Sequence, residues 1–267
     1  MSALNWYGAG KCIARVKDSV LQIGYLRSAN TLSNITGAFD GFKSIAIENN
    51  FTIAAADVDR GNPSKSGVIA VENWDRRVFV APPLTGTGSL VVSNMLAGAH
   101  NVYSMTVTVT NGANTATGRA FVAETATGAP AALVFANGAN WAGEVVSDGK
   151  VSLTNLVDAS SAANVSFGAL RLDRDFPIRV WKTGGVIAAN DKVNLASVPV
   201  GARSFSVLAM DEPLEIGDKI EIGLYPVDAE LPQDTRRLRY SAEPSENEDR
   251  VRLMATFSGR GMTIKIR

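Results

Sequence analysis

Short runs of alternating apolar and polar residues recur along most of this chain, and alternation with a period of two predicts β-strands. The runs are bounded by Asn, Gly and Pro and recur about every 8–12 residues, the rhythm of a β-sandwich or barrel. We therefore predict a mainly β fold of antiparallel, sandwich-like or barrel-like domains built from hairpins. The expected strands are Ser44–Glu48, Asn50–Ala55, Gly67–Val71, Arg77–Val80, Val102–Thr110, Phe167–Leu172, Ile178–Trp181, Gly185–Ala188, Ser204–Met210, Leu214–Ile216, Lys219–Tyr225, Arg250–Phe257 and Met262–Ile266.

Four dipeptides mark tight turns between these runs: Asn111-Gly112, Asn137-Gly138, Asp148-Gly149 and Gly217-Asp218. Both central residues of a type I′ turn need positive φ, which Asn-Gly and Asp-Gly adopt at little steric cost. Such pairs between alternating runs predict hairpins, in which neighbouring strands pair with each other.

The run Val102–Thr110 before the first of these turns predicts the clearest hairpin. A two-residue loop would place Thr108 opposite Thr115 and Thr106 opposite Thr117, on a face exposed to water. The alternate residues of the run, Tyr103, Met105, Val107 and Val109, would then point into a core. In the same way, the turn at Asp148-Gly149 would place Val146 opposite Val151.

We expect three parts: an N-terminal arm or helix over 1–40, a first β-domain over 41–160 and a second over 161–267. The spacing of Ile13, Val16, Val20 and Leu21 fits a helical stripe, although Val20–Leu26 also alternates like a strand. Small polar residues at 158–164 suggest the boundary between the two domains. The Ala-, Gly-, Thr- and Asn-rich tract at 85–165 predicts a shallow sheet with two wet faces, and no exact internal repeat is evident.

Charge excludes some partners. The chain of 267 residues has 26 Lys and Arg and 26 Asp and Glu, so its formal net charge is zero. No overall field attracts it to nucleic acid or to anionic lipid, and a neutral surface favours self-association. We expect no membrane partner, since no run approaches the roughly 20 apolar residues of a transmembrane helix. The N-terminus has no charged and apolar secretory pattern, so synthesis in the cytoplasm is expected.

Residues that perform chemistry are scarce. The single His100 lies in a loop context, no Gly-x-Ser-x-Gly motif is present, and the single Cys12 is expected to be a small buried residue, with an intermolecular disulfide left open. One His and one Cys cannot form a zinc site. The segment 57–62 is only faintly like a calcium loop, because Val68 stands where the bidentate acid belongs. We therefore expect no catalytic, cofactor-binding or metal-binding residues.

Three groups of residues leave alternatives open. Asp173 and Asp175 could lie on one side of a strand, as in a glycosidase, or form a surface cluster with Arg174. The run Arg236–Arg239 is followed by acids at 243–249, which suits a salt-bridged contact between subunits better than a nucleic-acid site. The four tryptophans could stack on sugars, but isolated aromatic residues in strands are mostly core or interface anchors. They are Trp6, Trp74, Trp141 and Trp181.

The central tract carries Val-Thr-Val-Thr at 107–110 and Thr-Asn-Gly-Ala-Asn-Thr-Ala-Thr-Gly at 110–118. In its composition, rich in Ala, Gly, Thr and Asn, this tract resembles virion structural proteins of tailed bacteriophages, such as capsid cement or decoration proteins and tail or neck components. The resemblance implies a non-enzymatic subunit of the virion, whose partners are its own copies and other virion proteins. Capsid stabilisation is the first expectation and a tail or neck role the alternative. A carbohydrate-binding module and a depolymerase that uses Asp173 or Asp175 are the competing hypotheses.

Overall fold

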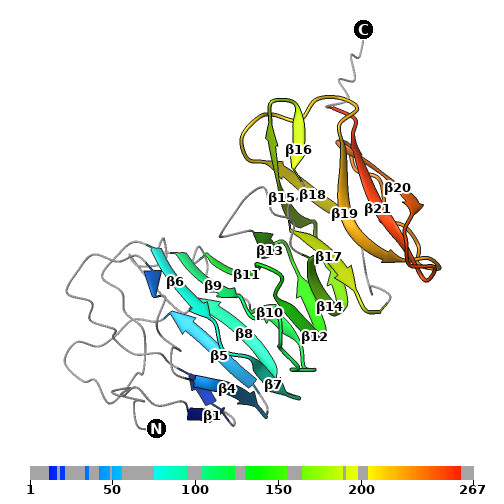
Figure 1. Cartoon of the computed structure of the whole chain (residues 1–267). Helices are drawn as coiled ribbons and strands as arrows, with labels where there is room; N and C mark the ends of the chain where they lie inside the picture. The colour runs from blue at the N-terminus through cyan, green and yellow to red at the C-terminus, as the bar shows by residue number, and fades with distance from the viewer. Residues whose placement is uncertain are drawn as a thin grey trace, which may run out of the picture.

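The computed structural model describes residues 12–16, 19–21, 34–35, 42–48, 50–55, 75–94, 104–123, 130–154, 164–188, 191–197 and 204–259. The regular elements in these ranges are all β-strands, which confirms the prediction of a mainly β protein. Figure 1 shows that the strands stack side by side along one direction, from β5 (Asn50–Ala55) towards β19 (Lys219–Pro226).

Most neighbouring strands are parallel, and this overturns the predicted antiparallel sandwich or barrel. In order along the sheet, a ten-stranded long sheet contains β2 (Ser19–Leu21), β5, β8 (Ser89–Asn94), β10 (Ala120–Val122), β12 (Asn140–Ser147), β14 (Asn164–Leu172), β17 (Lys192–Leu195), β19, β21 (Arg250–Phe257) and β20 (Leu238–Pro244). An opposing sheet contains β13 (Val151–Thr154), β11 (Ala131–Ala136), β9 (Ser104–Val109), β6 (Asp75–Val80) and β3 (Asn34–Ile35). A small sheet of β16 (Val186–Ala188), β15 (Phe176–Thr183) and β18 (Phe205–Ala209) follows, and a side sheet contains β1 (Cys12–Val16), β4 (Phe42–Ile47) and β7 (Leu84–Gly86).

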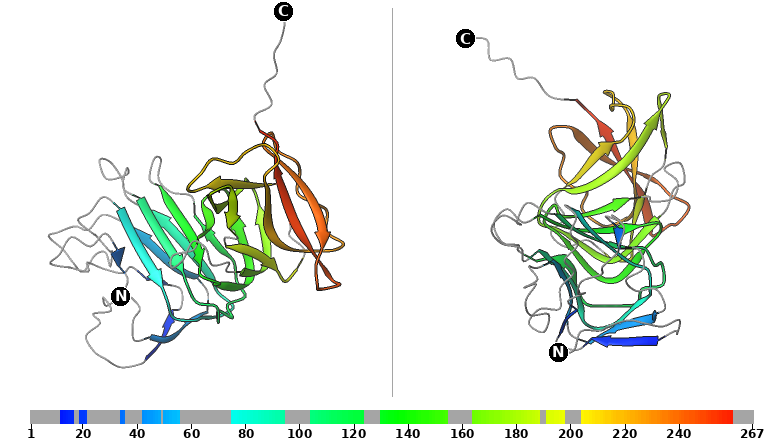
Figure 2. Two further views of the ribbon diagram at one scale, coloured as in Figure 1. Left: turned by 45° about the horizontal axis from the view of Figure 1, so that its top comes forward. Right: turned by 90° about the vertical axis from the view of Figure 1, so that its left-hand side faces the viewer.

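The chain forms a β-solenoid, because successive strands from β8 to β15 alternate between the long sheet and the sheet that faces it. Each full turn of the solenoid is here called a coil. A strand pairs with the equivalent strand of the next coil, about 25–30 residues away along the chain. Ala120 lies beside Val145, and Val145 lies beside Leu170. The small sheet extends the opposing sheet, since β13 and β15 are in contact. Figure 2 shows the stacked coils from two further directions.

All four predicted turn pairs lie in connections between strands, but each connection joins strands of different sheets, and only Asn137-Gly138 has positive φ at both residues. Asn137 and Gly138 have φ angles of 54° and 74°, as a type I′ turn requires, and the Ala139 N–H donates to the Ala136 carbonyl at 3.0 Å. The strands before and after this turn, β11 and β12, nevertheless belong to the opposing and long sheets. A tight turn fixes the local reversal of the chain and leaves the choice of partner strand open.

The predicted hairpin registers are consequently wrong. Thr108 lies between Phe79 and Val134, one coil before and one coil after it, and not opposite Thr115. Thr106 likewise lies between Arg77 and Ala132. The N–H groups of Thr115 and Thr117 donate to the carbonyls of Leu84 and Gly86 in β7. Val146 pairs with Arg171, and Val151 pairs with Leu133. Met105, Val107 and Val109 are buried as predicted.

Other expectations differ in their details. The strands β1 and β2 replace the expected N-terminal helix, and Leu214–Ile216 is a loop. The tract at 85–165 is not a wet sheet, because its strands contribute much of the buried core and even Thr108 is buried. The ladder between β12 and β14 joins the two expected β-domains within one sheet, and one core cluster extends from Ile45 to Ala255. The expected strands Gly67–Val71 and Met262–Ile266 lie outside the described residues.

A chain of aromatic rings runs through the core from one coil to the next. Each ring meets its neighbour edge to face, the preferred geometry for aromatic pairs. The centroid distances are 4.9, 6.4, 6.1 and 6.3 Å along the series Phe135, Phe167, Phe176, Phe205 and Tyr240. These residues come from β11, β14, β15, β18 and β20, so the chain of rings links the solenoid to its C-terminal hairpin.

Polar and small residues shape the corners of the coils. The side chains of Asn114 and Asn140 bond to each other's backbone, with Asn114 Nδ2 donating to the Asn140 carbonyl at 2.8 Å and Asn140 Nδ2 to the Asn114 carbonyl at 2.7 Å. The Leu84 N–H donates to Asn114 Oδ1 at 2.8 Å. Asn114 is therefore fully buried with its polar atoms satisfied, and it ties three successive coils together.

The antiparallel hairpin β20–β21 closes the C-terminal end of the stack. Beyond β18, the Tyr240 hydroxyl accepts a hydrogen bond from the Phe205 N–H at 2.8 Å and donates one to the Phe205 carbonyl. A side chain thus satisfies backbone groups that another strand would otherwise bind. The outer edge of β20 is covered as well: the Thr235 N–H donates to the Leu238 carbonyl, the Leu238 N–H donates to Thr235 Oγ1, and the Tyr240 N–H donates to Asp234 Oδ1. Capped edges resist unspecific strand addition.

The Tyr240→Phe variant should lose about 1–3 kcal/mol of unfolding free energy, because it leaves two backbone groups of Phe205 without this partner. Chemical denaturation followed by tryptophan fluorescence measures the loss. Tyr225→Phe is the matched control: its buried hydroxyl makes one longer bond, 3.3 Å to the Glu230 carbonyl. Equal losses in the two variants would contradict the capping role of Tyr240.

Candidate interaction surface

The exposed large apolar side chains of the described residues all lie in the C-terminal part of the chain. Their exposed fractions range from 37% to 79%, and they are Val186, Leu208, Met210, Ile216, Val227 and Leu231. The earlier coils bury their large apolar side chains more completely. Apolar side chains that gather at one end of a molecule commonly mark a contact surface.

Two loops meet at this end of the molecule, and three of these side chains lie in or directly beside them: Val186, Met210 and Ile216. The Gly184-Gly185 turn joins β15 to β16, and the backbone N–H groups of both glycines donate to the Glu212 carboxylate at 2.7 and 3.1 Å. The Thr183 hydroxyl donates to Asp211 at 2.8 Å. The loop 211–218, between β18 and β19, is therefore bound to the β15–β16 hairpin. It carries the exposed Ile216, while Val186 follows the Gly184-Gly185 turn and Met210 precedes the loop.

A buried ion pair between Lys182 of β15 and Asp218 also holds the loop 211–218 in place. Lys182 Nζ lies 2.6 Å from Asp218 Oδ2 and 3.9 Å from Glu215 Oε2, and the Lys182 side chain is only 3% exposed. Asp218 Oδ2 also accepts the Glu215 N–H at 2.7 Å. The Asp218 carboxylate thus has both a charged partner and a backbone N–H partner, whereas the Glu215 side chain remains 83% exposed. The loop presents Glu215 and Ile216 to solvent on a fixed base.

These contacts keep the charged groups ionised. The hydrogen bond from Lys182 lowers the pKa of Asp218 below its ordinary value, and the same bond raises the pKa of Lys182. The N–H groups of Gly185 and Gly184 lower the pKa of Glu212. A nucleophilic lysine needs a lowered pKa. Lys182 therefore acts as a structural cation in this region.

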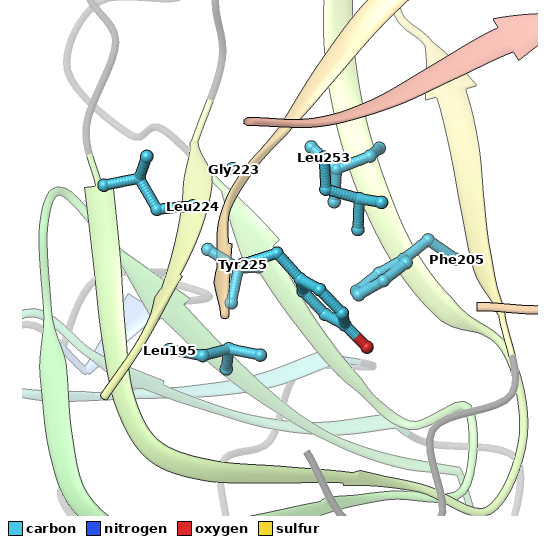
Figure 3. A pocket seen from close by; sticks show the side chains of 8 residues that line it. Leu195, Phe205, Gly223, Leu224, Tyr225 and Leu253 are labelled. Carbon is cyan, nitrogen blue, oxygen red and sulfur yellow. The ribbon is translucent and has the colours of Figure 1, made fainter. Parts of the chain in front are cut away.

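The enclosed space nearest to this end is part of the core. It is lined by apolar residues of β17, β18, β19 and β21 and leaves no room for a water molecule. Figure 3 shows the ring of Tyr225 facing Phe205, with Leu195 and Leu253 beside them. The Tyr225 hydroxyl donates to the Glu230 carbonyl at 3.3 Å, and burial raises the pKa of Tyr225 to about 12. The arrangement is that of a packed core.

Asp191 is a buried acid that sequence reasoning missed. It is 1% exposed, and neither carboxylate oxygen has a hydrogen-bond partner among the described residues. Burial raises its pKa to about 7. The signal was available in the alternation of Asp191, Val193 and Leu195, which places all three side chains on one face, but β17 itself was not predicted. Because Asp191 does not reach solvent, its ionisation affects the stability of the fold.

The two acids of the depolymerase hypothesis lie in the turn between β14 and β15, not along a strand. Asp173 Oδ2 lies 3.2 Å from Arg171 Nη2, and Asp175 accepts a hydrogen bond from the Ser204 hydroxyl. Both side chains thus have structural partners in an exposed turn. This is the surface cluster that was the alternative in the sequence, formed with Arg171 where Arg174 was expected.

The basic run and the acids after it are separated by the length of β20. Arg236, Arg237 and Arg239 are exposed near the start of the strand, whereas Glu246, Glu248 and Asp249 lie in the turn beyond its end. Within the strand, Glu243 is 3.3 Å from both Lys219 Nζ and Arg252 Nη2. Among the described residues, the basic run and the acids beyond β20 therefore form no ion pair with each other.

The tryptophans divide between core and surface. Trp141 is a core anchor, fully buried, with its indole N–H donating to the Gly118 carbonyl at 2.8 Å. Trp181 is half-buried on the outer face of the small sheet, and it pairs with Ala188 of β16. Trp6, Trp74, His100 and the loop 57–62 lie outside the described residues, as does the side chain of Cys12.

Within the described residues, no group of three or more His, Cys, Asp or Glu side chains is arranged to hold a metal ion. The same residues include no helix long and apolar enough to cross a membrane. Comparison of the chain with protein-family models, with curated proteins and with solved structures finds no match.

Proposed function

We propose that this chain is a non-enzymatic structural subunit of a virus particle, which assembles with its own copies and with other virion proteins. It would be made in the host cytoplasm and end up in the virion. The observation that carries the proposal is the concentration of exposed apolar side chains at the C-terminal end of a stack whose other coils are well buried. The neutral net charge and the residue composition of the central tract agree with this proposal.

The stacked architecture favours a tail or neck component over a capsid decoration protein. A solenoid grows along one axis, and its ends and outer faces are the surfaces available for contacts. Successive coils are joined by the chain of aromatic rings and by the hydrogen bonds between Asn114 and Asn140. Such a stack suits an elongated assembly, in which subunits meet at their ends.

The proposal predicts that the chain is a stoichiometric component of purified particles. Quantitative mass spectrometry of gradient-purified particles should detect it at a fixed copy number, and antibody labelling in electron micrographs should place it at one location. Absence from washed particles would contradict the proposal. Trp181→Ala on a glycan array tests the carbohydrate-binding alternative, since loss of a measurable sugar affinity would favour a binding module.

A further inference from the structure

The end of the molecule at the loop 211–218 combines an apolar centre with charges of both signs. Ile216 is 79% exposed, the highest value among the large apolar residues described. Gly217 follows it and donates its N–H to the Phe257 carbonyl at 2.8 Å, and the next residue, Ser258, donates to the Arg237 carbonyl at 2.8 Å. We call Asp211, Glu215, Ile216, Arg236 and Arg237 the end face.

The charges of the end face are divided between its two sides. Glu215 and Asp211 are exposed on the side of the β15–β16 hairpin, where Lys182 is already neutralised by Asp218. Arg236 and Arg237 are exposed on the side of β20, and neither makes an ion pair with another described residue. The acidic groups thus come from the loop 211–218, and the basic groups from the segment before β20, across the contacts of Gly217 with Phe257 and of Ser258 with Arg237. A twofold rotation about Ile216 would bring the acidic side of one copy onto the basic side of another.

We propose that the end face is a self-complementary interface that binds a second copy of this chain. In this twofold contact, Ile216 packs against Ile216 of the other copy, and Glu215 of each copy faces Arg236 and Arg237 of the other. Isologous contacts need one patch that carries both complementary halves, and the end face carries them. Exposed Val186 and Met210 extend the apolar part. The inference rests on the proposed function in one respect, that copies of the chain associate.

The charge arrangement gives a test that does not depend on one substitution. Sedimentation velocity of the full chain over a range of concentrations should show a dimer. Glu215→Arg should weaken dimerisation at least tenfold, because it places two arginine-rich sides together, and Arg237→Glu should do the same. The double variant Glu215→Arg/Arg237→Glu should recover most of the affinity. Ile216→Asp should abolish dimerisation while the circular dichroism spectrum stays unchanged.

Val227→Asp is the control, because Val227 is 52% exposed but lies beyond the opposite end of β19. It should dimerise like the unmodified chain. A chain that stays monomeric at all concentrations, an Ile216→Asp variant that dimerises normally, or a double variant no better than the single ones would overturn the proposed interface. Particle incorporation is measured separately. Dimers that are absent from particles would remove the virion role and leave the interface intact.

Discussion

Asp191→Asn should raise the unfolding free energy by up to about 4 kcal/mol at pH 8 and change it little at pH 4. The carboxyl group is buried, neither oxygen is hydrogen-bonded within the described part of the chain, and burial raises its pKa from 3.8 to about 7. Removing a charge from water without a partner penalises the charged form. The amide keeps nearly the same shape and carries no charge at either pH.

The sign follows from proton binding. The folded protein holds the Asp191 proton more tightly than the unfolded chain, so ionisation destabilises the folded state. The contribution of Asp191 to the unfolding free energy is fully present below about pH 4. It decreases as the pH rises towards 7 and stays low above that pH. Asp191→Asn should flatten this part of the profile. Folding measured by urea denaturation at several pH values tests it.

Asp173→Asn provides a matched control, since Asp173 is exposed and paired with Arg171 at the surface. Surface pairs contribute about 0–1 kcal/mol, so this variant should shift stability little and show no rise between pH 4 and 8. If Asp191→Asn gave the same change at every pH, the carboxyl would have a partner or a water that keeps it charged at low cost.

The sequence predicted the local structure of this chain well and its pairing poorly. Asn50–Ala55 is a strand with the predicted bounds, and Asn137-Gly138 has the predicted turn geometry. Both follow from the preferences of residues that are close along the chain. Strand partners, in contrast, lie about 25–30 residues apart and depend on contacts that no short pattern contains. No exact repeat marks the coils, because equivalent core positions of successive coils carry different side chains, such as Trp141 beside Phe167.

The candidate surface was predictable only in part. The Arg236–Arg239 run was identified in the sequence, and the structure leaves its arginines exposed. Ile216 was expected within a strand, where alternation would have placed it in or near a core. Its exposure results from the contacts of Lys182 with Asp218 and of Gly217 with Phe257, which hold the loop in place. These contacts join segments that are more than 30 residues apart, and single-sequence reasoning had no means to find them.

The small residues of the central tract have a packing role that composition alone did not reveal. Gly118, Gly143 and Gly168 stack on one another in successive coils, and the last two lie inside β12 and β14, where the ladder between these strands is irregular. A Cβ atom on Gly168 would lie 1.9 Å from the Ala142 carbonyl oxygen, and one on Gly143 would lie 2.1 Å from the Gly118 carbonyl oxygen. The backbone of each coil rests directly on the backbone of the coil before it, so the atoms in the way cannot rotate aside.

Gly168→Ala should therefore destabilise the protein by about 3 kcal/mol or more, because the added methyl group forces two coils apart. Gly143→Ala should have a similar effect, and thermal unfolding measured by circular dichroism compares them. Gly112→Ala is the control: its Cβ would meet only the Gly138 carbonyl oxygen, at 3.1 Å, so a shift of a few tenths of an ångström suffices and the loss should stay within about 1 kcal/mol. In an antiparallel sandwich, Gly143 and Gly168 would not face the preceding coil. Equal effects at Gly112 and Gly168 would therefore count against the parallel stacking itself.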